Sequence, residues 1–427
     1  MADILIKPAR AIQGTLNVPG DKSISHRALI LAAMAEGTSR IHGLSDARDV
    51  ASTRTCLQAL GIKITRARGV FSVAGMGKYG FRPAKKPLDA GNSGSTIRML
   101  AGLLAAQPFT TTITGDESLR RRPMRRIIEP LEQMGAHIES DSYKAPLVIK
   151  GGPLRSIDYA STIASAQVKS CILLAGLYAN GTTRITEPSP SRDHTERMLG
   201  AFGVTARFSQ AGAGVQGPAT LHACDLEVPG DLSSAAFFLV AAALLQDSEV
   251  TVKQVSVNPT RMGICDALSS MGAMIRMTPA ILVQGEPRAD LTARSSRLHA
   301  ASLGGSMIPR ILDEIPILAV AATQAQGVTV VRDAGELRLK ESDRLTAVAR
   351  NLLAMGANVR ETRDGLIING PTPLHGAEID SFDDHRIAMA FAIAGLIASG
   401  ETVIRNSECV QISFPGFFEL LDQLRQD

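Results

Sequence analysis

"VPGDKSISHRALILAAMAEGTSRI", residues 18–41, has a sibling in the second half of the chain, "VPGDLSSAAFFLVAAALLQDSEVTV", residues 228–252. Each copy begins with Val-Pro-Gly-Asp, continues through a serine-containing start into an alanine-rich run with helical spacing, and ends as a short strand. Two copies of the same helix-to-strand sequence indicate an internal duplication.

Further copies of this unit occupy the rest of the chain at a spacing of roughly 70 residues. After five of the strands, a polar loop leads to an amphipathic run that ends in a glycine turn, as in "LQALGIKI" and "LLAMGANV". The sequence of each unit therefore predicts the order strand, helix, strand, helix, strand. Six such units predict an α/β fold for the whole chain. The six helix-to-strand segments are "LILAAMAEGTSRI", "LAGLLAAQPFTTTI", "ILLAGLYANGTTRI", "LVAAALLQDSEVTV", "LAVAATQAQGVTVV" and "FAIAGLIASGETVI".

The two Val-Pro-Gly-Asp copies divide the six units into two groups of three. We therefore expect two similar lobes, one of residues 21–229 and one of residues 1–20 plus 230–427, with the chain crossing near Gly20 and Gly230. The first strand, within residues 1–20, is expected to pair with the second lobe. Because the first helices of the units occupy equivalent positions, their positive N-terminal ends would point the same way and meet in a cleft between the lobes.

The composition is that of an ordinary globular protein: 427 residues, of which 45% are hydrophobic and 20% charged. The net charge is only +4, the arginine-rich stretch "LRRRPMRR" at 119–126 is short, and there is no tryptophan to stack bases, so no nucleic-acid partner is expected. The N-terminus lacks a signal-peptide pattern and no apolar run approaches a membrane span, which favours a cytoplasmic protein without a membrane partner. Five scattered cysteines without a Cys-x-x-Cys pair favour reduced, mostly buried thiols.

Residues that occur in one copy only are candidates for function, because structural needs are shared by all copies. Lys22 and Arg27 lie in the first turns of the first copy, where the second copy has Leu232 and Phe237. A helix N-terminus is already positive, so additional cations there indicate a bound anion. A solvated basic face is the alternative for Arg27.

The segment "GNSGS" at 91–95 opens the next helix, and Gly94 would let backbone N–H groups approach a ligand closely. The same residues are also ordinary turn chemistry, and they do not form a Walker loop because no Gly-Lys-Ser or Gly-Lys-Thr follows. The segment "GMGKYG" at 75–80 matches a dinucleotide fingerprint, but prolines rather than a helix follow it, which excludes that site.

Three further segments bring polar residues to loops or to the starts of helices. Arg122 precedes Pro123, which predicts an extended backbone from which the guanidinium could hold a carboxylate or phosphate with two hydrogen bonds. The other two segments contain serines at the starts of helices or in loops, and simple helix capping explains these serines as well as ligand binding does. The first of them, "IASAQVKS", offers Ser165, Gln167 and Lys169, and the second, "PSPSRDHTE", offers Ser191, Arg192 and His194.

Charged residues also gather at two segments of the second half. Asp313 and Glu314 interrupt an apolar run, which is costly unless at least one of them is paired or faces a cleft. Lys340, Glu341 and Arg344 are spaced so that Lys340 and Arg344 would share one face of a helical turn. A surface salt-bridge cluster is the alternative for these three.

The segment "FDDHRIAMAF" adds His385 and Arg386 directly after two aspartates. Aspartate and histidine side chains are common metal ligands. A single histidine without a second one at metal-ligand spacing is poor evidence for such a site, so no metal is expected.

With these segments in order, the chain resembles the enolpyruvyl transferase family, and within it the 5-enolpyruvylshikimate-3-phosphate synthases. The resemblance covers essentially the whole chain and is carried by "PGDKSISHR", "GNSGS", "RRPM", "ASAQVKS", "SRDHTE", "LDE", "KESDR", "DDHR" and "SFPGF". It implies two lobes, each an inside-out α/β barrel of three βαβαββ units, that close over a cleft.

The resemblance also implies transfer of the enolpyruvyl group of phosphoenolpyruvate to the 5-hydroxyl of shikimate 3-phosphate, with release of phosphate, in the shikimate pathway to chorismate and the aromatic amino acids. Both substrates are polyanions, which accounts for the cations at the first helix. The residues that match shikimate 3-phosphate contacts are Lys22, Ser23, Arg27, Ser165, Gln167, Ser191, Asp313 and Lys340. Those that match phosphoenolpyruvate contacts are Lys22, Gly94, Arg122, Gln167, Arg344 and Arg386.

The implied chemistry is an addition followed by an elimination, which needs a proton donor for the methylene carbon and a base for the hydroxyl. Asp313, Glu341 and Lys22 match the catalytic residues, Asp313 as the proton acceptor and Glu341 or Lys22 in proton transfer. No metal or organic cofactor is implied, and we expect a monomer that acts on small molecules.

Two positions depart from the family pattern. Some members have a lysine where this chain has Ile412, so that phosphate contact is missing or is supplied by Gln411, and some have an asparagine where this chain has Glu336. The branch of the family that acts on UDP-N-acetylglucosamine usually carries a cysteine in the loop matching residues 115–125, and none occurs here. A non-catalytic scaffold is the other alternative, but it would not concentrate unmatched charges at the same ends of several units.

Overall fold

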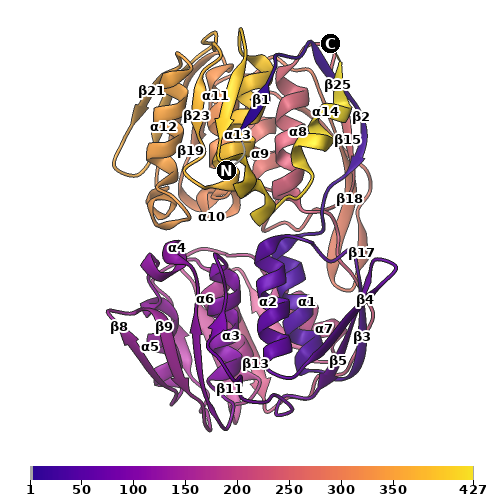
Figure 1. The fold of residues 1–427 in the computed structure, drawn as a ribbon, viewed down its shortest axis with the longest axis vertical. Coiled ribbons are helices and arrows are strands. Elements are labelled where there is room, and N and C mark those ends of the chain that lie inside the picture. The colour runs from indigo at the N-terminus through magenta and orange to yellow at the C-terminus, as the bar shows by residue number, and fades with distance from the viewer. Residues whose placement is uncertain (1–2, 427) are drawn as a thin grey trace. The chain divides into compact units, whose positions relative to one another are not determined.

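The computed structural model describes residues 3–426, and these form two compact units (Figure 1). The N-terminal unit comprises Gly20–Pro229 and Leu282–Glu286, and the C-terminal unit comprises Met1–Pro19, Gly230–Ile281 and Pro287–Asp427. The chain therefore passes from one unit to the other at four points. The excursion of residues 282–286 into the N-terminal unit is not among the boundaries that the sequence repeat predicts.

Three four-stranded sheets of one pattern build the N-terminal unit, in the orders β14-β3-β5-β4, β6-β7-β9-β8 and β10-β11-β13-β12. In each sheet the first two strands are parallel and the other neighbours are antiparallel. The strands are β3 (Glu36–His42), β4 (Lys63–Ala67), β5 (Val70–Met76), β6 (Leu88–Asp89), β7 (Thr110–Thr114), β8 (His137–Asp141), β9 (Lys144–Lys150), β10 (Asp158–Ala160), β11 (Gly181–Thr186), β12 (Ala206–Ser209), β13 (Gly212–Gly217) and β14 (Leu226–Glu227). The helices are α1 (Lys22–Met34), α2 (Arg48–Ala59), α3 (Gly94–Leu104), α4 (Glu117–Arg121), α5 (Arg125–Gln133), α6 (Ala166–Gly176) and α7 (His194–Ala201).

The C-terminal unit contains sheets of the orders β19-β20-β22-β21, β1-β24-β23 and β16-β18-β15-β2-β25, with β17 on β18. Strand β2 pairs with β15 and β1 pairs with β24, so the expectation that the N-terminal strand joins the second half of the chain is confirmed. The strands are β1 (Ile4–Ile6), β2 (Ala11–Asn17), β15 (Glu249–Ser256), β16 (Met274–Met277), β17 (Ile281–Val283), β18 (Glu286–Arg294), β19 (Ser302–Leu303), β20 (Gly327–Val331), β21 (Asn358–Glu361), β22 (Leu366–Gly370), β23 (Glu378–Asp380), β24 (Thr402–Arg405) and β25 (Arg425–Gln426). The helices are α8 (Leu232–Leu244), α9 (Gly263–Ser270), α10 (Ile308–Ile311), α11 (Ile315–Thr323), α12 (Arg344–Ala354), α13 (His385–Ile397) and α14 (Phe417–Leu424), with 3₁₀ turns η1 (Gly305–Met307), η2 (Gly335–Leu339) and η3 (Ser407–Ile412).

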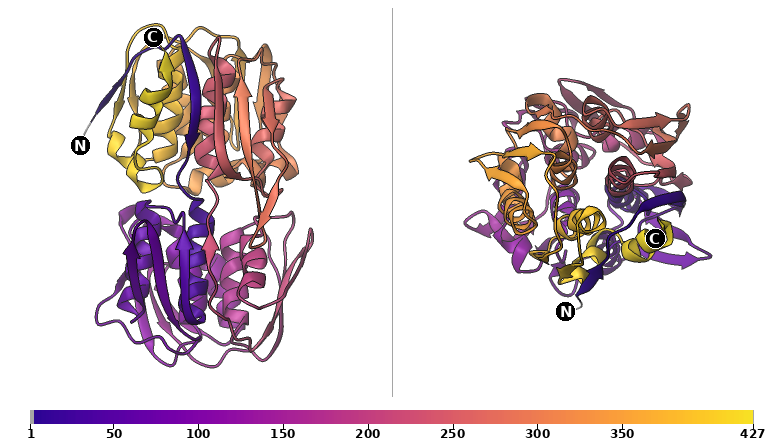
Figure 2. Two further views of the ribbon diagram at one scale, coloured as in Figure 1. Left: turned by 90° about the vertical axis from the view of Figure 1, so that its right-hand side faces the viewer. Right: turned by 90° about the horizontal axis from the view of Figure 1, so that it is seen from above.

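Six buried helices form at the positions that the repeat predicts: α1, α3 and α6 in the N-terminal unit, and α8, α11 and α13 in the C-terminal unit. Each is buried along nearly its whole length, and α8 buries every residue from Leu232 to Ala243. A helix of this composition is stable only inside a protein. In Figure 2 the sheets lie on the outside of each unit and the helices within.

Small residues in these helices allow close packing, and Gly102 of α3 is the clearest case. A Cβ at this position would lie 2.2 Å from the carbonyl oxygen of Cys171 in α6. We therefore expect Gly102→Ala to lower the free energy of unfolding by about 2 kcal/mol, because the two backbones must separate. Urea unfolding measures this effect. Gly200→Ala in α7 is the control, since a Cβ there meets no atom within 4 Å and alanine favours a helix, and equal destabilisation of both variants would contradict the packing argument.

The five cysteines are free, and most of them are buried, as expected. Cys56, Cys171, Cys265 and Cys409 are buried, and Cys224 is partly buried. Burial raises the pKa of the Cys56 and Cys171 thiols to about 12. These thiols are therefore protonated and unreactive at neutral pH.

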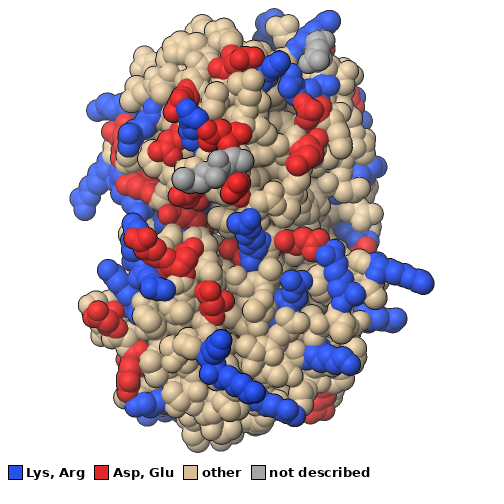
Figure 3. All heavy atoms as spheres, in the orientation of Figure 1, with Lys and Arg blue, Asp and Glu red and all other residues tan. Residues whose placement is uncertain are grey.

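Positive and negative side chains are mixed over the face seen in Figure 3, and neither sign gathers into a continuous field there. Within residues 3–426, none of the helices combines the length and the apolar character that crossing a membrane requires.

Candidate active site

The first turns of α1, α3 and α6 lie together in the N-terminal unit. Arg27 of α1 donates from Nη2 to Ser170 Oγ (2.6 Å) and to the carbonyl of Ala166 (3.4 Å), both in α6. Gln167 at the start of α6 donates from Nε2 to Ser95 Oγ of α3 (2.9 Å). Three positive helix ends therefore meet at one place, which suits a bound anion.

Arg27 is buried and supplies a cation at this place. Its Nε donates to Thr195 Oγ1 (2.7 Å) and its Nη1 to the carbonyl of Ser23 (2.8 Å). These partners, like those in α6, are neutral, so they orient the guanidinium without cancelling its charge. Burial lowers the pKa of Arg27 to about 10, which still leaves it charged at neutral pH.

Lys22 begins α1, and its Nζ forms an ion pair with Asp49 of α2 at 2.9 Å. Ser23 follows it, and its Oγ accepts a hydrogen bond from Arg192 at 3.4 Å. The sequence did not single out Asp49, because an acid in the first turn of a helix is the usual complement of the helix dipole.

Gly94 begins α3 beside two arginines. A Cβ on Gly94 would lie 2.7 Å from Arg98 Nη1 and 3.3 Å from Arg122 Nη1. Arg122 has the extended backbone that its place before a proline predicts, and it donates to Asn92 Oδ1 (2.9 Å). Arg98, which the sequence did not indicate, donates to Gln167 Oε1 (2.6 Å) and so joins this group to α6.

The tight space at Gly94 gives a testable expectation. Gly94→Ala should displace the guanidinium groups of Arg98 and Arg122 and narrow the pocket that the resemblance assigns to phosphoenolpyruvate. We expect the KM for phosphoenolpyruvate to rise about tenfold, with the KM for shikimate 3-phosphate changed less than about threefold. Steady-state kinetics with each substrate varied in turn measures both constants. An unchanged KM for phosphoenolpyruvate would remove Gly94 from that pocket.

Ser165 and Ser191 are both engaged in hydrogen bonds. Ser165 is the N-cap of α6, where its Oγ accepts from the N–H of Val168 at 3.5 Å, as simple capping predicts. Ser191, in the loop after β11, donates from Oγ to Glu187 Oε2 at 2.9 Å. Glu187 is a further residue that the sequence did not indicate.

In the C-terminal unit, Arg344 is buried at the centre of a group of carboxylates. Its Nη2 lies 2.7 Å from Glu341 Oε2, its Nε 2.8 Å from Asp384 Oδ2, and its Nη1 3.3 Å from Asp313 Oδ1. Burial opposes the charge of Arg344, but Asp384, Glu341 and Asp313 outweigh it and raise the pKa. Three carboxylates therefore surround this guanidinium.

Arg386 of α13 lies 3.9 Å from both Asp313 Oδ2 and Glu314 Oε1. Glu314 is buried and accepts a hydrogen bond from Ser233 of α8. Asp313 keeps a partly exposed side chain beside Arg344. Both acids of the apolar segment are thus paired, as expected, and the first turns of α8, α11 and α13 meet just as those of the N-terminal unit do.

The prediction that Lys340 and Arg344 share one helical turn is wrong. Lys340 follows the 3₁₀ turn η2, and α12 begins only at Arg344, with Asp343 as its N-cap accepting from the N–H of Thr346. The capping aspartate fixes the helix start, so Lys340 and Glu341 lie in the preceding bend. Burial lowers the pKa of Lys340, although Asp313 and Glu336 favour its charged form.

The departures from the family pattern lie on the 3₁₀ turns. Ile412 ends η3 and packs against the hydrophobic core of the C-terminal unit, so it offers no phosphate contact. Gln411 precedes it and is half-buried, and Glu336 lies in η2. Among the described residues no group of three His, Cys, Asp or Glu side chains could hold a metal ion.

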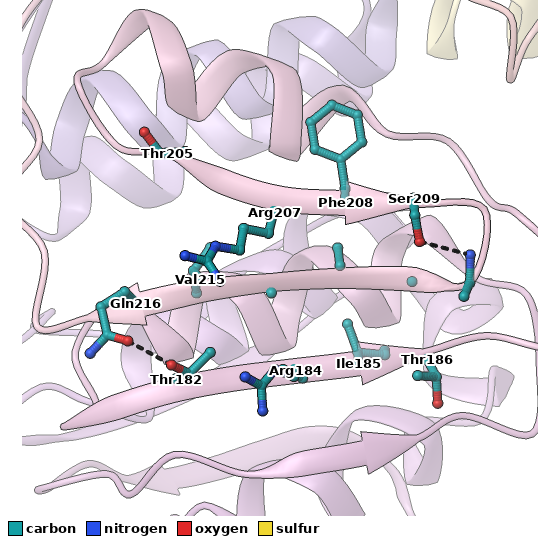
Figure 4. A pocket seen from close by; sticks show the side chains of 14 residues that line it. Thr182, Arg184, Ile185, Thr186, Thr205, Arg207, Phe208, Ser209, Val215 and Gln216 are labelled. Atoms are coloured by element: carbon teal, nitrogen blue, oxygen red, sulfur yellow. Dashed lines mark hydrogen bonds between the residues drawn. The ribbon is translucent and has the colours of Figure 1, made fainter.

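A cavity of about 450 Å³ lies elsewhere, over β11, β12 and β13 (Figure 4). Gly212 and Gly214 leave its floor bare, and Arg184 and Arg207 flank Gly214 in the strand register. None of the candidate site residues lines it. The volume of a cavity is therefore not sufficient to identify the functional site of this protein.

The structure thus has two groups of cations at helix starts, and in the C-terminal unit these cations lie beside carboxylates. The chain belongs to the family of EPSP synthase (3-phosphoshikimate 1-carboxyvinyltransferase), whose family model matches residues 6–421.

Relatives of this name match the whole chain. The 3-phosphoshikimate 1-carboxyvinyltransferase of Gloeobacter violaceus is 52% identical over 425 residues, covering 99% of this chain and 98% of the relative. That of Geobacter sulfurreducens is 49% identical over 426 residues, covering 99% of both chains. The structure of EPSP synthase from Acinetobacter baumannii superposes with a TM-score of 0.88 at 42% identity, covering 99% of this chain and 98% of that one.

Proposed function

We propose that this protein transfers the enolpyruvyl group of phosphoenolpyruvate to the 5-hydroxyl of shikimate 3-phosphate and releases phosphate. The observation that carries the proposal is the pair of cation groups, Lys22 and Arg27 at helix starts in one unit, and Arg344 and Arg386 beside Asp313 in the other. Two polyanionic substrates need such charges, and a proton transfer between them needs the carboxylate.

We assign the binding of shikimate 3-phosphate to the first group of cations, Lys22 and Arg27. Arg27 is held by neutral partners and so has charge available for a phosphate ester, and Lys22 lies at the positive end of α1. Hydroxyls and amides at the same helix starts would orient the sugar-like ring. The proposed contacts are Lys22, Ser23, Arg27, Ser165, Gln167, Ser191, Asp313 and Lys340.

We assign the binding of phosphoenolpyruvate mainly to three arginines, Arg122, Arg344 and Arg386. Arginine suits it because the planar guanidinium holds a carboxylate or a phosphate with two parallel hydrogen bonds. Gly94 leaves space beside Arg122 where a side chain would close it. The proposed contacts are Lys22, Gly94, Arg122, Gln167, Arg344 and Arg386.

The reaction proceeds by addition and elimination. The methylene carbon of phosphoenolpyruvate takes a proton from Glu341 or Lys22, and the 5-hydroxyl attacks the cationic carbon as Asp313 accepts its proton. The tetrahedral intermediate then loses phosphate, and the methyl group returns a proton to Glu341 or Lys22, whichever donated the first one, which restores the double bond. In this proposal Arg344 binds the donor next to Asp313 and Glu341, so the carboxylates for proton transfer lie beside the reacting atoms.

The step belongs to the shikimate pathway, which leads to chorismate and the aromatic amino acids, and we place the protein in the cytoplasm. One chain supplies every proposed contact, so a monomer suffices. No cofactor, nucleic acid or membrane takes part.

Solvent deuterium tests the proposed chemistry. In D₂O, with both substrates present, we expect the vinyl group of the product to acquire deuterium, because the methylene carbon passes through a methyl group. Mass spectrometry of the purified product measures the incorporation. A product that forms without deuterium would exclude the addition–elimination sequence, and the absence of any product would exclude the transfer itself.

A further inference from the structure

A buried cluster of one lysine and two glutamates lies beside the proposed acceptor contacts and has no part in the chemistry above. Lys169 of α6 lies 3.0 Å from both Glu187 and Glu196, and all three side chains are at most 4% exposed. Burying such charges costs several kcal/mol before their mutual attraction is counted. Apolar side chains at these positions would avoid this cost, so the presence of three buried charges needs a functional explanation.

Glu187 ties together two segments that carry proposed acceptor contacts. Its Oε1 accepts from the N–H of Ser165, the N-cap of α6, at 2.9 Å. Its Oε2 accepts from Ser191 Oγ, in the loop after β11, at 2.9 Å. One carboxylate therefore fixes the distance between these serines and also sets the rotamer of the Ser191 hydroxyl.

Lys169 reinforces the same connection. Its Nζ donates to the carbonyl of Ser191 at 3.2 Å and forms the ion pair with Glu187. The loop at Ser191 is thus held by its carbonyl and by its hydroxyl. Burial opposes the charge of Lys169, but Glu196 and Glu187 outweigh it and raise the pKa, so the ammonium stays charged.

We infer that Glu187 and Lys169 are positioning residues for recognition of the acceptor, holding Ser165 and Ser191 at a fixed spacing and orientation. The inference rests on the proposed function. A hydroxyl on a loop rotates freely unless a partner holds it, and a group that is held before binding loses less conformational entropy when the ligand binds. Loss of the cluster is therefore expected to raise the KM for shikimate 3-phosphate and to leave the KM for phosphoenolpyruvate nearly unchanged.

Glu187→Gln tests this role with little change of shape. Lys169 keeps its ion pair with Glu196, so no cation is left unpaired. The amide cannot accept from Ser165, Ser191 and Lys169 together, because one of its two polar atoms is a donor. We expect the KM for shikimate 3-phosphate to rise about tenfold, with kcat and the KM for phosphoenolpyruvate changed less than about threefold.

Two comparisons separate positioning from a merely structural effect. Glu139→Gln makes the same chemical change in an exposed ion pair with Lys150 and should leave every constant unchanged. In a Ser191→Ala background, Glu187→Gln should raise the KM for shikimate 3-phosphate less than about threefold, because its effect runs largely through the missing hydroxyl. If Glu187→Gln fails to fold, Lys169→Arg keeps the charge and must raise the same KM selectively.

An unchanged KM for shikimate 3-phosphate, an equal rise for both substrates, or full additivity with Ser191→Ala would overturn the inference. Failure of the proposed function would show differently, because the unaltered protein would then not turn over shikimate 3-phosphate at all.

Discussion

Asp313→Ala is expected to lower kcat about 10³-fold while leaving a folded protein. Asp313 is the acid of the C-terminal unit that touches both Arg344 (3.3 Å) and Arg386 (3.9 Å) and keeps part of its side chain exposed. Without it, the 5-hydroxyl has no base at the moment of attack. The measurement is phosphate release at saturating concentrations of both substrates.

The interpretation of this variant depends on the state of its neighbours. Arg344 retains Glu341 and Asp384, so its charge stays compensated and the fold is expected to survive. Asp422→Ala, at an exposed position of the same unit, is the control and should retain full activity. Near-normal turnover by Asp313→Ala would remove this residue from the mechanism.

Lys22→Ala is expected to lower kcat/KM about 10³-fold, equivalent to about 4 kcal/mol, for both substrates. Lys22 is the first residue of α1, where the helix end and the ammonium act on the same anion. Because the proposal has Lys22 contact both substrates, the loss should appear whichever substrate is varied. Lys150→Ala, at an exposed position of the same unit, is expected to have no effect.

The ion pair of Lys22 with Asp49 offers a second explanation for such a loss, and a double variant separates the two. Lys22→Ala leaves the Asp49 carboxylate without this partner, whereas Lys22→Ala with Asp49→Asn removes both charges. If the lysine acts on the substrates, the double variant stays as inactive as the single one. Recovery of activity in the double variant would assign the loss to the unpaired carboxylate.

The repeat was strong enough to predict much of the fold. All six buried helices start where the copies align, because each copy has the same physical need for a capped, apolar helix beside a strand. The excursion of residues 282–286 was not predictable, since it occurs once and its contacts lie far away in the sequence. Glu286 in this segment pairs with His194 at 2.7 Å, across 92 positions.

The candidate site shows the same division between local and distant effects. Lys22 and Arg27 stood out because cations at a helix start conflict with the helix dipole. The helical turn assigned to Lys340 and Arg344 failed because spacing alone cannot show that Asp343 caps a helix beginning at Arg344. Glu187 gave no signal, because its partner Ser165 is brought to it only by the pairing of β10 and β11 and the packing of α6, and its hydrogen bond with Ser191, four residues along the same loop, follows no helix or strand period.

The most direct test of the account is phosphate release from the purified protein with phosphoenolpyruvate and either shikimate 3-phosphate or UDP-N-acetylglucosamine, without added metal. We predict rapid release with shikimate 3-phosphate and none with the nucleotide sugar. Release with the nucleotide sugar alone would contradict the acceptor assigned here while keeping the donor. Release with neither would contradict the proposed transfer as a whole.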